Sequence, residues 1–119
     1  MTPSDSPVPL DISLWAQGIE KEYQERDKDR LRLLAQAIDL IAEYFKEKKV
    51  ESVYLTGSIL RAGHFYPFSD VDIAVAGLRE DYWRVMVELE DLLDRTVDLI
   101  ELERCRFCEV IKKHGKKIV

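Results

Sequence analysis

Apolar residues recur at helical spacing over the first half of the chain. The steps between them are three or four residues, which places them on one face of an α-helix. These positions are Leu31, Leu34, Ile38, Ile41 and Phe45. The pattern predicts a helical section from about Leu14 to Lys48, either as one long helix or as two helices broken near Asp27.

A charged stretch interrupts this stripe between Glu20 and Arg30. The simplest interpretation is a helix face in solvent. The alternative is a helix that binds a partner, because the apolar residues before and within the charged stretch otherwise lack a burial site. These residues are Leu14, Trp15, Ile19 and Tyr23.

Short apolar runs rich in β-branched residues alternate with helical patterns in the second half. We expect strands at residues 50–56, 71–76 and 96–101, and a short fourth strand at 116–119. Expected helices fall at 58–61, 81–95 and 103–114, the last ended by Gly115. The order predicts an α/β (α+β) fold: a small mixed sheet of three to four strands with helices mainly on one face, plus an N-terminal helix.

The chain length suits one domain. Its 119 residues can bury a core without disulfides or structural metals. Residues 1–13, rich in proline, are expected to form a flexible arm. Residues 14–119 are expected to form the single domain, with an N-terminal helical section at 14–49 and a core at 50–119.

Charge and hydropathy exclude two classes of partner. The net charge of −5 disfavours binding to nucleic acid, which depends on Lys and Arg neutralising phosphates. We expect neither a membrane partner nor a sequence-specific nucleic acid, since no apolar run approaches the length of a bilayer span and the first residues do not resemble a signal peptide. A cytoplasmic protein follows. Its only cysteines, Cys105 and Cys108, lack a second pair and are interpreted as packing residues.

Three aspartates carry the candidate chemistry. Asp70 and Asp72 lie two residues apart at the start of a strand, so both point to one face of the sheet. Asp98 lies in the next expected strand and joins them if the two strands are neighbours. Clustered carboxylates repel each other, and divalent cations relieve that repulsion. Oxygen ligands suit Mg²⁺ or Mn²⁺, so we expect these three residues to bind metal and to be catalytic.

A Gly-Ser pair supplies the complementary feature. Gly57 and Ser58 follow a strand and open a helical turn, where free backbone N–H groups favour phosphate. Arg61, one turn later, can reach the same phosphates. We expect these three residues to bind the phosphates of a ligand.

The run GSILRAGHFYPFSDVDIAVAGL resembles the signature of polymerase-beta-like nucleotidyltransferases, and the compact chain resembles the minimal MNT antitoxins of HEPN–MNT toxin–antitoxin pairs. The resemblance covers residues 50–119 and implies the nucleotidyltransferase fold. It implies that Gly57 and Ser58 hold the triphosphate and that Asp70 and Asp72 bind the metals. Asp98 would bind metal and help to deprotonate the attacking hydroxyl.

The resemblance also implies an activity and a partner. The chain would be a Mg²⁺-dependent enzyme that moves AMP from ATP to a hydroxyl, a tyrosine of a cognate HEPN ribonuclease toxin, within a hetero-oligomer. The alternatives are an antitoxin that neutralises its partner by binding without catalysis, and a small-molecule nucleotidyltransferase acting on an aminoglycoside-like acceptor.

The loop before the aspartates departs from the family pattern. Between Ser58 and Asp70 the chain has one residue more than is common, and we expect Ala62 to be the addition. Ser69 is expected to brace the turn and His64 to be an ordinary loop residue. The aromatic residues of this loop are expected to close a core edge rather than to stack a base.

Overall fold

The computed structural model describes the backbone of residues 8–119 and the side chains from residue 13 onward. Residues 1–7 of the expected arm lie outside this range. Residues 8–13 belong to the first helix, so the helical section begins earlier than the sequence pattern indicated. The division into residues 14–49 and 50–119 stays a prediction.

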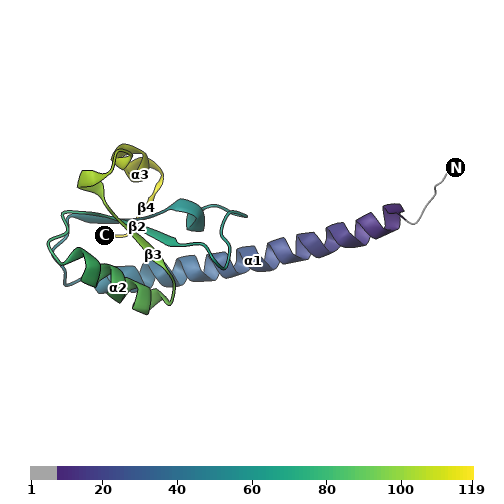
Figure 1. Cartoon of the computed structure of the whole chain (residues 1–119), viewed down its shortest axis with the longest axis horizontal. Coiled ribbons are helices and arrows are strands. Elements are labelled where there is room, and N and C mark those ends of the chain that lie inside the picture. The colour runs from purple at the N-terminus through teal and green to yellow at the C-terminus, as the bar shows by residue number, and fades with distance from the viewer. Residues whose placement is uncertain (1–7) are drawn as a thin grey trace.

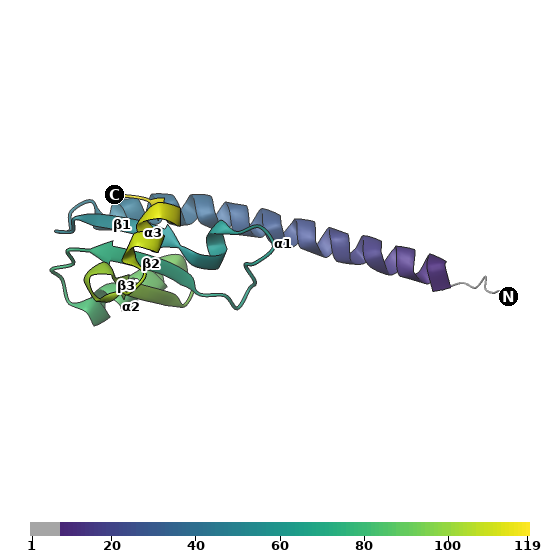
Figure 2. The same cartoon turned by 90° about the horizontal axis from the view of Figure 1, so that it is seen from above.

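Helix α1, Val8–Phe45, is one uninterrupted helix of 38 residues. No break occurs near Asp27, because the charged stretch around it consists mainly of Glu, Lys, Arg and Gln, which are good helix formers. The C-terminal half of α1 lies along the sheet, and the N-terminal half extends beyond it (Figures 1 and 2).

Four strands form one mixed sheet in the order β3-β2-β1-β4. Their bounds are Ser52–Thr56 for β1, Val71–Ala76 for β2, Val97–Glu101 for β3 and Lys116–Lys117 for β4. Strand β1 pairs antiparallel with β2 and β4, whereas β2 and β3 run parallel. The mixed sheet of the predicted fold class is confirmed, and the expected C-terminal strand is its short fourth member.

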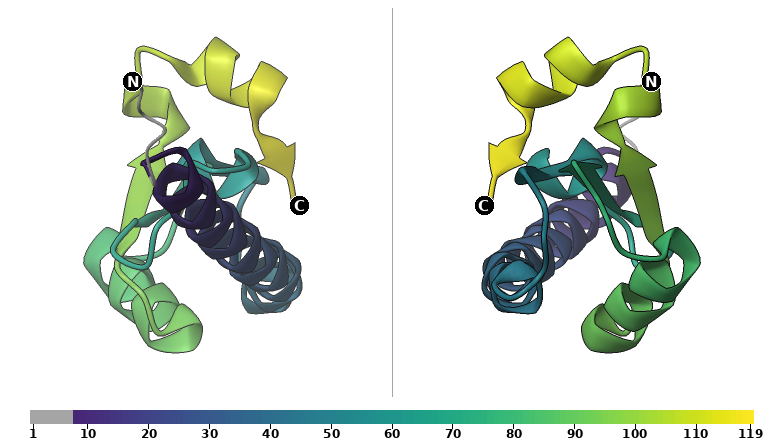
Figure 3. Two further views of the ribbon diagram at one scale, coloured as in Figure 1. Left: turned by 90° about the vertical axis from the view of Figure 1, so that its right-hand side faces the viewer. Right: turned by 90° about the vertical axis from the view of Figure 1, so that its left-hand side faces the viewer.

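Alternate residues of the strands bury opposite faces of the sheet. One face packs on α1 and on α2, Tyr82–Leu93, through a core that includes Ile41, Phe45, Ile73 and Leu89. The other face carries a smaller cluster under helix α3, Cys108–His114. Figure 3 shows α1 and α2 on one side of the sheet and α3 on the other. Helices therefore lie mainly, but not wholly, on one face.

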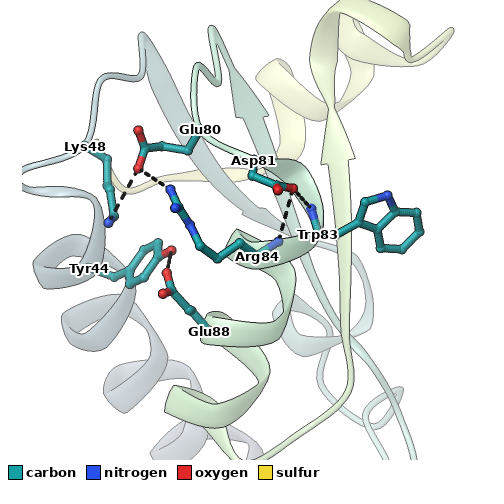
Figure 4. Close-up of polar contacts among 7 residues, drawn as sticks. All are labelled: Tyr44, Lys48, Glu80, Asp81, Trp83, Arg84 and Glu88. Atoms are coloured by element: carbon teal, nitrogen blue, oxygen red, sulfur yellow. Dashed lines mark hydrogen bonds and ion pairs between the residues drawn. The ribbon is translucent and has the colours of Figure 1, made fainter.

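Polar contacts join the outer surfaces of α1 and α2 (Figure 4). The Tyr44 hydroxyl donates to Glu88 Oε1 at 2.6 Å. Glu80 lies 3.8 Å from Lys48 Nζ and 3.1 Å from Arg84 Nη2. The Tyr44–Glu88 hydrogen bond connects α1 to α2, and the Lys48–Glu80 ion pair connects the segment after α1 to the segment before α2.

The C-terminal region is not the single helix expected at 103–114. A 3-10 turn, η3 at Leu102–Arg104, is followed by a break and then by α3. Leu102 and Ile111 both bury against Tyr54 and Ala74. Residues nine apart point to opposite sides of a continuous α-helix, so the helix must break for both to reach the sheet. Cys105 and Cys108 flank this break as half-buried free thiols that pack on the same cluster, as predicted.

Candidate active site

A row of polar residues crosses the sheet at one end. Thr56 of β1 lies opposite Asp72 of β2, and Asp72 lies opposite Asp98 of β3. Directly paired residues of neighbouring strands point to the same face. Since Ile73 and Leu99 face α1 and α2, the row of Thr56, Asp72 and Asp98 faces the α3 side. The structure thus makes Asp72 and Asp98 neighbours, as the sequence required for a shared site.

Asp72 is the most perturbed carboxylate of the site. Its side chain is half-buried, whereas Asp70 and Asp98 are exposed. Burial, followed by the negative charges of Asp98 and Asp70, raises the pKa of Asp72 to about 6. The charges of Asp70 and Asp98 therefore act on Asp72, and a cation placed beside Asp72 would relieve that repulsion.

The donor set suits a hard divalent cation. Carboxylate oxygens are the ligands that Mg²⁺ and Mn²⁺ prefer, and the mutual repulsion at Asp72 is the kind that such an ion removes. Among the residues with described side chains, no three acidic, histidine or cysteine groups already stand at metal-binding distances. The aspartates thus offer the oxygen ligands that a divalent cation prefers, but the three groups do not already stand at coordination distances from one point. The assignment of Asp70, Asp72 and Asp98 as ligands of that cation stays a prediction.

Gly57 contacts the carboxylate of Asp72 directly. It opens the 3-10 turn η2, Gly57–Leu60, with a φ of +83°, a conformation that strongly favours glycine. A Cβ atom here would collide with Asp72 Oδ2. Because Gly57 has no side chain, the Gly57-Ser58 backbone can lie in contact with Asp72. The turn expected to bind phosphate is therefore next to the residues expected to bind metal.

Arg61 and His114 both line a hollow next to this turn. The hollow has a volume of about 300 Å³ and is lined by Thr56, Gly57, Leu60, Arg61 and His114. His114 ends α3 and was not among the residues expected at the site. His114 reaches this hollow because α3 packs across the sheet. Its local sequence does not indicate a site, since the basic residues around it are typical of an ordinary helix end.

The middle of α1 supports the turn from behind. The Arg30 side chain is buried and donates from Nη1 to the Ile59 carbonyl at 2.9 Å and from Nε to Asp27 at 2.8 Å. Asp27 also accepts the Gly63 N–H at 3.3 Å. The hydrogen bond from Arg30 holds the pKa of Asp27 below its usual value. The expectation that this charged stretch only faces solvent is wrong for Arg30.

The Gly63 turn packs against α1 as well. Gly63 has a φ of +80°, and a Cβ there would meet the Tyr23 ring at 2.7 Å. Ala62, the expected additional residue, is exposed.

Arg95 organises the rest of the loop. Its Nη2 donates to the carbonyls of Tyr66, Pro67 and Ser69 at 2.8–3.0 Å. The Ser69 hydroxyl accepts the Tyr66 N–H at 2.9 Å, so its bracing role is confirmed. Arg95 was not identified from the sequence, because nothing local links it to residues so far upstream.

The remaining loop residues follow the simpler expectations only in part. Phe65 is buried in the main core, and His64 is exposed, as expected. Tyr66 and Phe68 stack on each other with ring centroids 5.4 Å apart, but both are exposed, Phe68 by 82%. The expectation that the loop aromatics close a core edge is therefore wrong for these two residues.

Known proteins match both the sequence and the fold of the chain. A family model described as "Polymerase beta, Nucleotidyltransferase" matches residues 39–119. Among curated proteins, none matches the chain in sequence.

Several similar solved structures are toxin–antitoxin complexes. A chain of a toxin–antitoxin complex with AMP-PNP is 27% identical with a TM-score of 0.58, over 69% of this chain and 72% of that one. A chain of an MntA-HpeT variant with two aspartate-to-glutamate substitutions is 25% identical, with the same TM-score of 0.58 and the same coverage of 69% and 72%. A chain of the MntA-HepT complex is 25% identical with a TM-score of 0.52, over 70% of this chain and 69% of that one.

Proposed function

Because this chain belongs to the polymerase beta nucleotidyltransferase family, we propose that it transfers AMP from ATP to a protein hydroxyl, in the role of an antitoxin that modifies its partner toxin. The observation that carries the proposal is the row of Asp72 and Asp98 on neighbouring strands, with Gly57 in contact with Asp72. This arrangement brings the Gly57-Ser58 turn and a pair of carboxylates to one place.

Each site residue has a distinct role in the proposed reaction. Gly57 and Ser58 hold the triphosphate through backbone N–H groups and the Ser58 hydroxyl, and Arg61 adds a cation beside them. The acceptor oxygen attacks the α-phosphorus, the bond to the β-phosphate breaks, and pyrophosphate leaves. Asp98 is exposed and can receive the proton of the acceptor hydroxyl.

The family implies a divalent cation, Mg²⁺ or Mn²⁺, at Asp70, Asp72 and Asp98. When bound, such a cation neutralises the carboxylates and stabilises the charge that develops on the phosphates. The chain itself supplies the carboxylate oxygen ligands. The contact between Gly57 and Asp72 sets their distance from the Gly57-Ser58 turn, and α1 supports that turn through Arg30.

A protein partner supplies the acceptor in this proposal. Similar chains occur in toxin–antitoxin complexes, one of them holding AMP-PNP. We propose a tyrosine of a HEPN-type toxin as the acceptor, and ATP as the donor. None of the helices in the described range combines the length and apolar content needed to cross a bilayer.

A transfer assay tests the proposal. The chain is incubated with its partner toxin, Mg²⁺ and ATP labelled on the α-phosphate, and label on the toxin is followed with time. Wild type is expected to label the toxin, and the double variant Asp70→Asn with Asp72→Asn is not. Asp91→Asn, on the exposed surface of α2, is the matched control and should label normally.

The second candidate function is neutralisation by binding alone. The observation that favours it is the exposure of apolar residues on the N-terminal half of α1: Leu14 is 66% exposed and Trp15 68%. If the double aspartate variant still neutralises the toxin fully and wild type transfers no label, binding is the function and catalysis is not.

A further inference from the structure

An arginine-lined cavity lies behind the active-site loop. It has a volume of about 200 Å³ and opens between α1 and the loop segment 65–67. Arg26 and Arg30 reach it from α1, and Arg95 reaches it from the end of α2. Since α1 packs on the sheet face opposite Asp72 and Asp98, this cavity is separate from the catalytic row.

The positive charges of this cavity are only partly neutralised. Arg30 pairs with Asp27, and Asp29, which also lines the cavity, pairs with Arg32 at 3.1 Å. Neither Arg26 nor Arg95 forms an ion pair with the acidic side chains described from residue 13 onward.

Aromatic rings hold the two unpaired guanidinium groups in place. Arg26 lies over the Tyr66 ring at 4.5 Å, and Arg95 lies over the Phe65 ring at 4.6 Å. Stacking fixes a guanidinium plane but leaves the N–H groups at its edge available for hydrogen bonds. The loop carbonyls use the Nη2 donors of Arg95, whereas the stacking supplies no acceptor for the Nε atoms of the two arginines.

Each of these two arginines keeps a buried donor without an acceptor. The Nε atoms of Arg26 and Arg95 are the buried side-chain nitrogen or oxygen atoms that lack a hydrogen-bond partner in the described part of the chain. A buried N–H without an acceptor is costly, and an ordered water or an ion is the usual explanation. Water can accept the hydrogen bonds, but only an anion also balances the two charges.

We propose that this cavity binds a phosphate-type oxyanion between Arg26 and Arg95. A phosphate group offers several acceptor oxygens, and the planar fork of a guanidinium matches it in geometry. The bound anion would connect α1 to the loop carbonyls that Arg95 holds, and so would stiffen the segment that leads into Asp70. Free phosphate, pyrophosphate and the phosphate of a nucleotide share this chemistry.

The test uses the full chain at constant ionic strength, with chloride as the reference salt. Inorganic phosphate, pyrophosphate and AMP are titrated separately while the Nε–H signals of the arginines are followed by NMR. The signals of Arg26 and Arg95 are expected to shift with phosphate. The affinity of each probe is then compared between wild type and Arg26→Gln. The probe whose affinity falls most identifies which of phosphate, pyrophosphate and AMP the cavity binds.

Arg26→Gln removes the charge and leaves the loop hydrogen bonds of Arg95 intact. It is expected to weaken phosphate binding about tenfold, the effect of losing one charge-assisted hydrogen bond. Lys28→Gln, which removes one positive charge from an exposed position of the same helix, is the control and should bind as wild type does. Unmoved Nε–H signals, or equal weakening in both variants, would overturn the proposal.

Discussion

Arg30 of α1 donates a 2.9 Å hydrogen bond to the carbonyl oxygen of Ile59, the residue directly after the Gly57-Ser58 pair. The two residues are 29 positions apart, and the bond is buried. A helix outside the Gly-Ser and aspartate motif thus fixes the turn on which the motif depends.

Replacing Arg30 should therefore affect both stability and nucleotide binding. Arg30→Met leaves the Ile59 carbonyl and Asp27 without their donor, and should lower the free energy of unfolding by about 2 kcal/mol. The KM for ATP should rise as the turn loosens. Urea denaturation and initial rates measure the two effects. Arg32→Met, which removes an exposed pair on the same helix, should cost less than about 0.5 kcal/mol. Equal effects of the two variants would contradict the supporting role.

Gly57→Ala should abolish transfer while leaving the fold intact. The added Cβ collides with Asp72 Oδ2 and demands a φ that alanine avoids, so the turn and the aspartate must separate. Loss of label transfer with a retained circular dichroism spectrum is the expected result. A methyl group added at Gly18 would lie in open space, so Gly18→Ala should instead stabilise α1 by up to about 1 kcal/mol. Normal transfer by Gly57→Ala would show that the contact is not needed.

Asp72→Asn should change how stability depends on pH. The pKa of Asp72 in the folded chain is about 6, above an unfolded value of about 3.9, so the folded state binds the proton more tightly. Ionisation of Asp72 therefore reduces stability as pH rises from about 4 to about 6. The Asn variant lacks this loss. In buffer without divalent metal it should be more stable than wild type at pH 7 by about 1 kcal/mol, a figure reduced for solvent screening of a half-exposed group.

Thermal unfolding between pH 4 and pH 8 measures this difference. The advantage of Asp72→Asn should shrink as pH falls towards 4, and Mg²⁺ should stabilise wild type more than the variant. A constant difference across the pH range would argue against repulsion among the aspartates. Asp91→Asn serves again as the exposed control.

His114 should contribute to nucleotide affinity although it lies far from the motif in sequence. It lines the hollow beside Gly57 together with Arg61, so His114→Ala should raise the KM for ATP about threefold to tenfold, the range for loss of one hydrogen bond. His64→Ala is the matched control, because the chain has two histidines and His64 is exposed in the loop. Identical KM values for the two variants would remove His114 from the site.

Local patterns were sufficient to predict the strands. Strand β2 has the bounds that its apolar run indicated, and the spacing of Asp70 and Asp72 predicts that they share one face. The sequence brings Asp98 to Asp72 only if their strands are neighbours, and the parallel pairing of β2 with β3 meets that condition. These features depend on residues that are close in sequence or on a simple rule of sheet geometry.

The supporting residues could not be predicted in the same way. Arg30, Arg95 and His114 each act across more than 25 positions in sequence, on Ile59, on Tyr66 and next to Gly57. A charged residue in a helix is expected to be exposed unless its tertiary partner is known. The break before α3 was missed for a related reason, since it depends on two side chains reaching the same patch of the sheet.

The length of α1 has a consequence for how the chain opens. Side chains from Ser13 to Glu25 are all exposed, so this part of the helix is stabilised mainly by its own backbone bonds, with Gly18 weakening it. Its amide protons should exchange with solvent through local fraying, whereas those beyond Arg30 should exchange only when the whole domain unfolds. The boundary between the two rates falls at Asp27 and Arg30, which hydrogen-bond to Gly63 and Ile59 of the loop beyond β1.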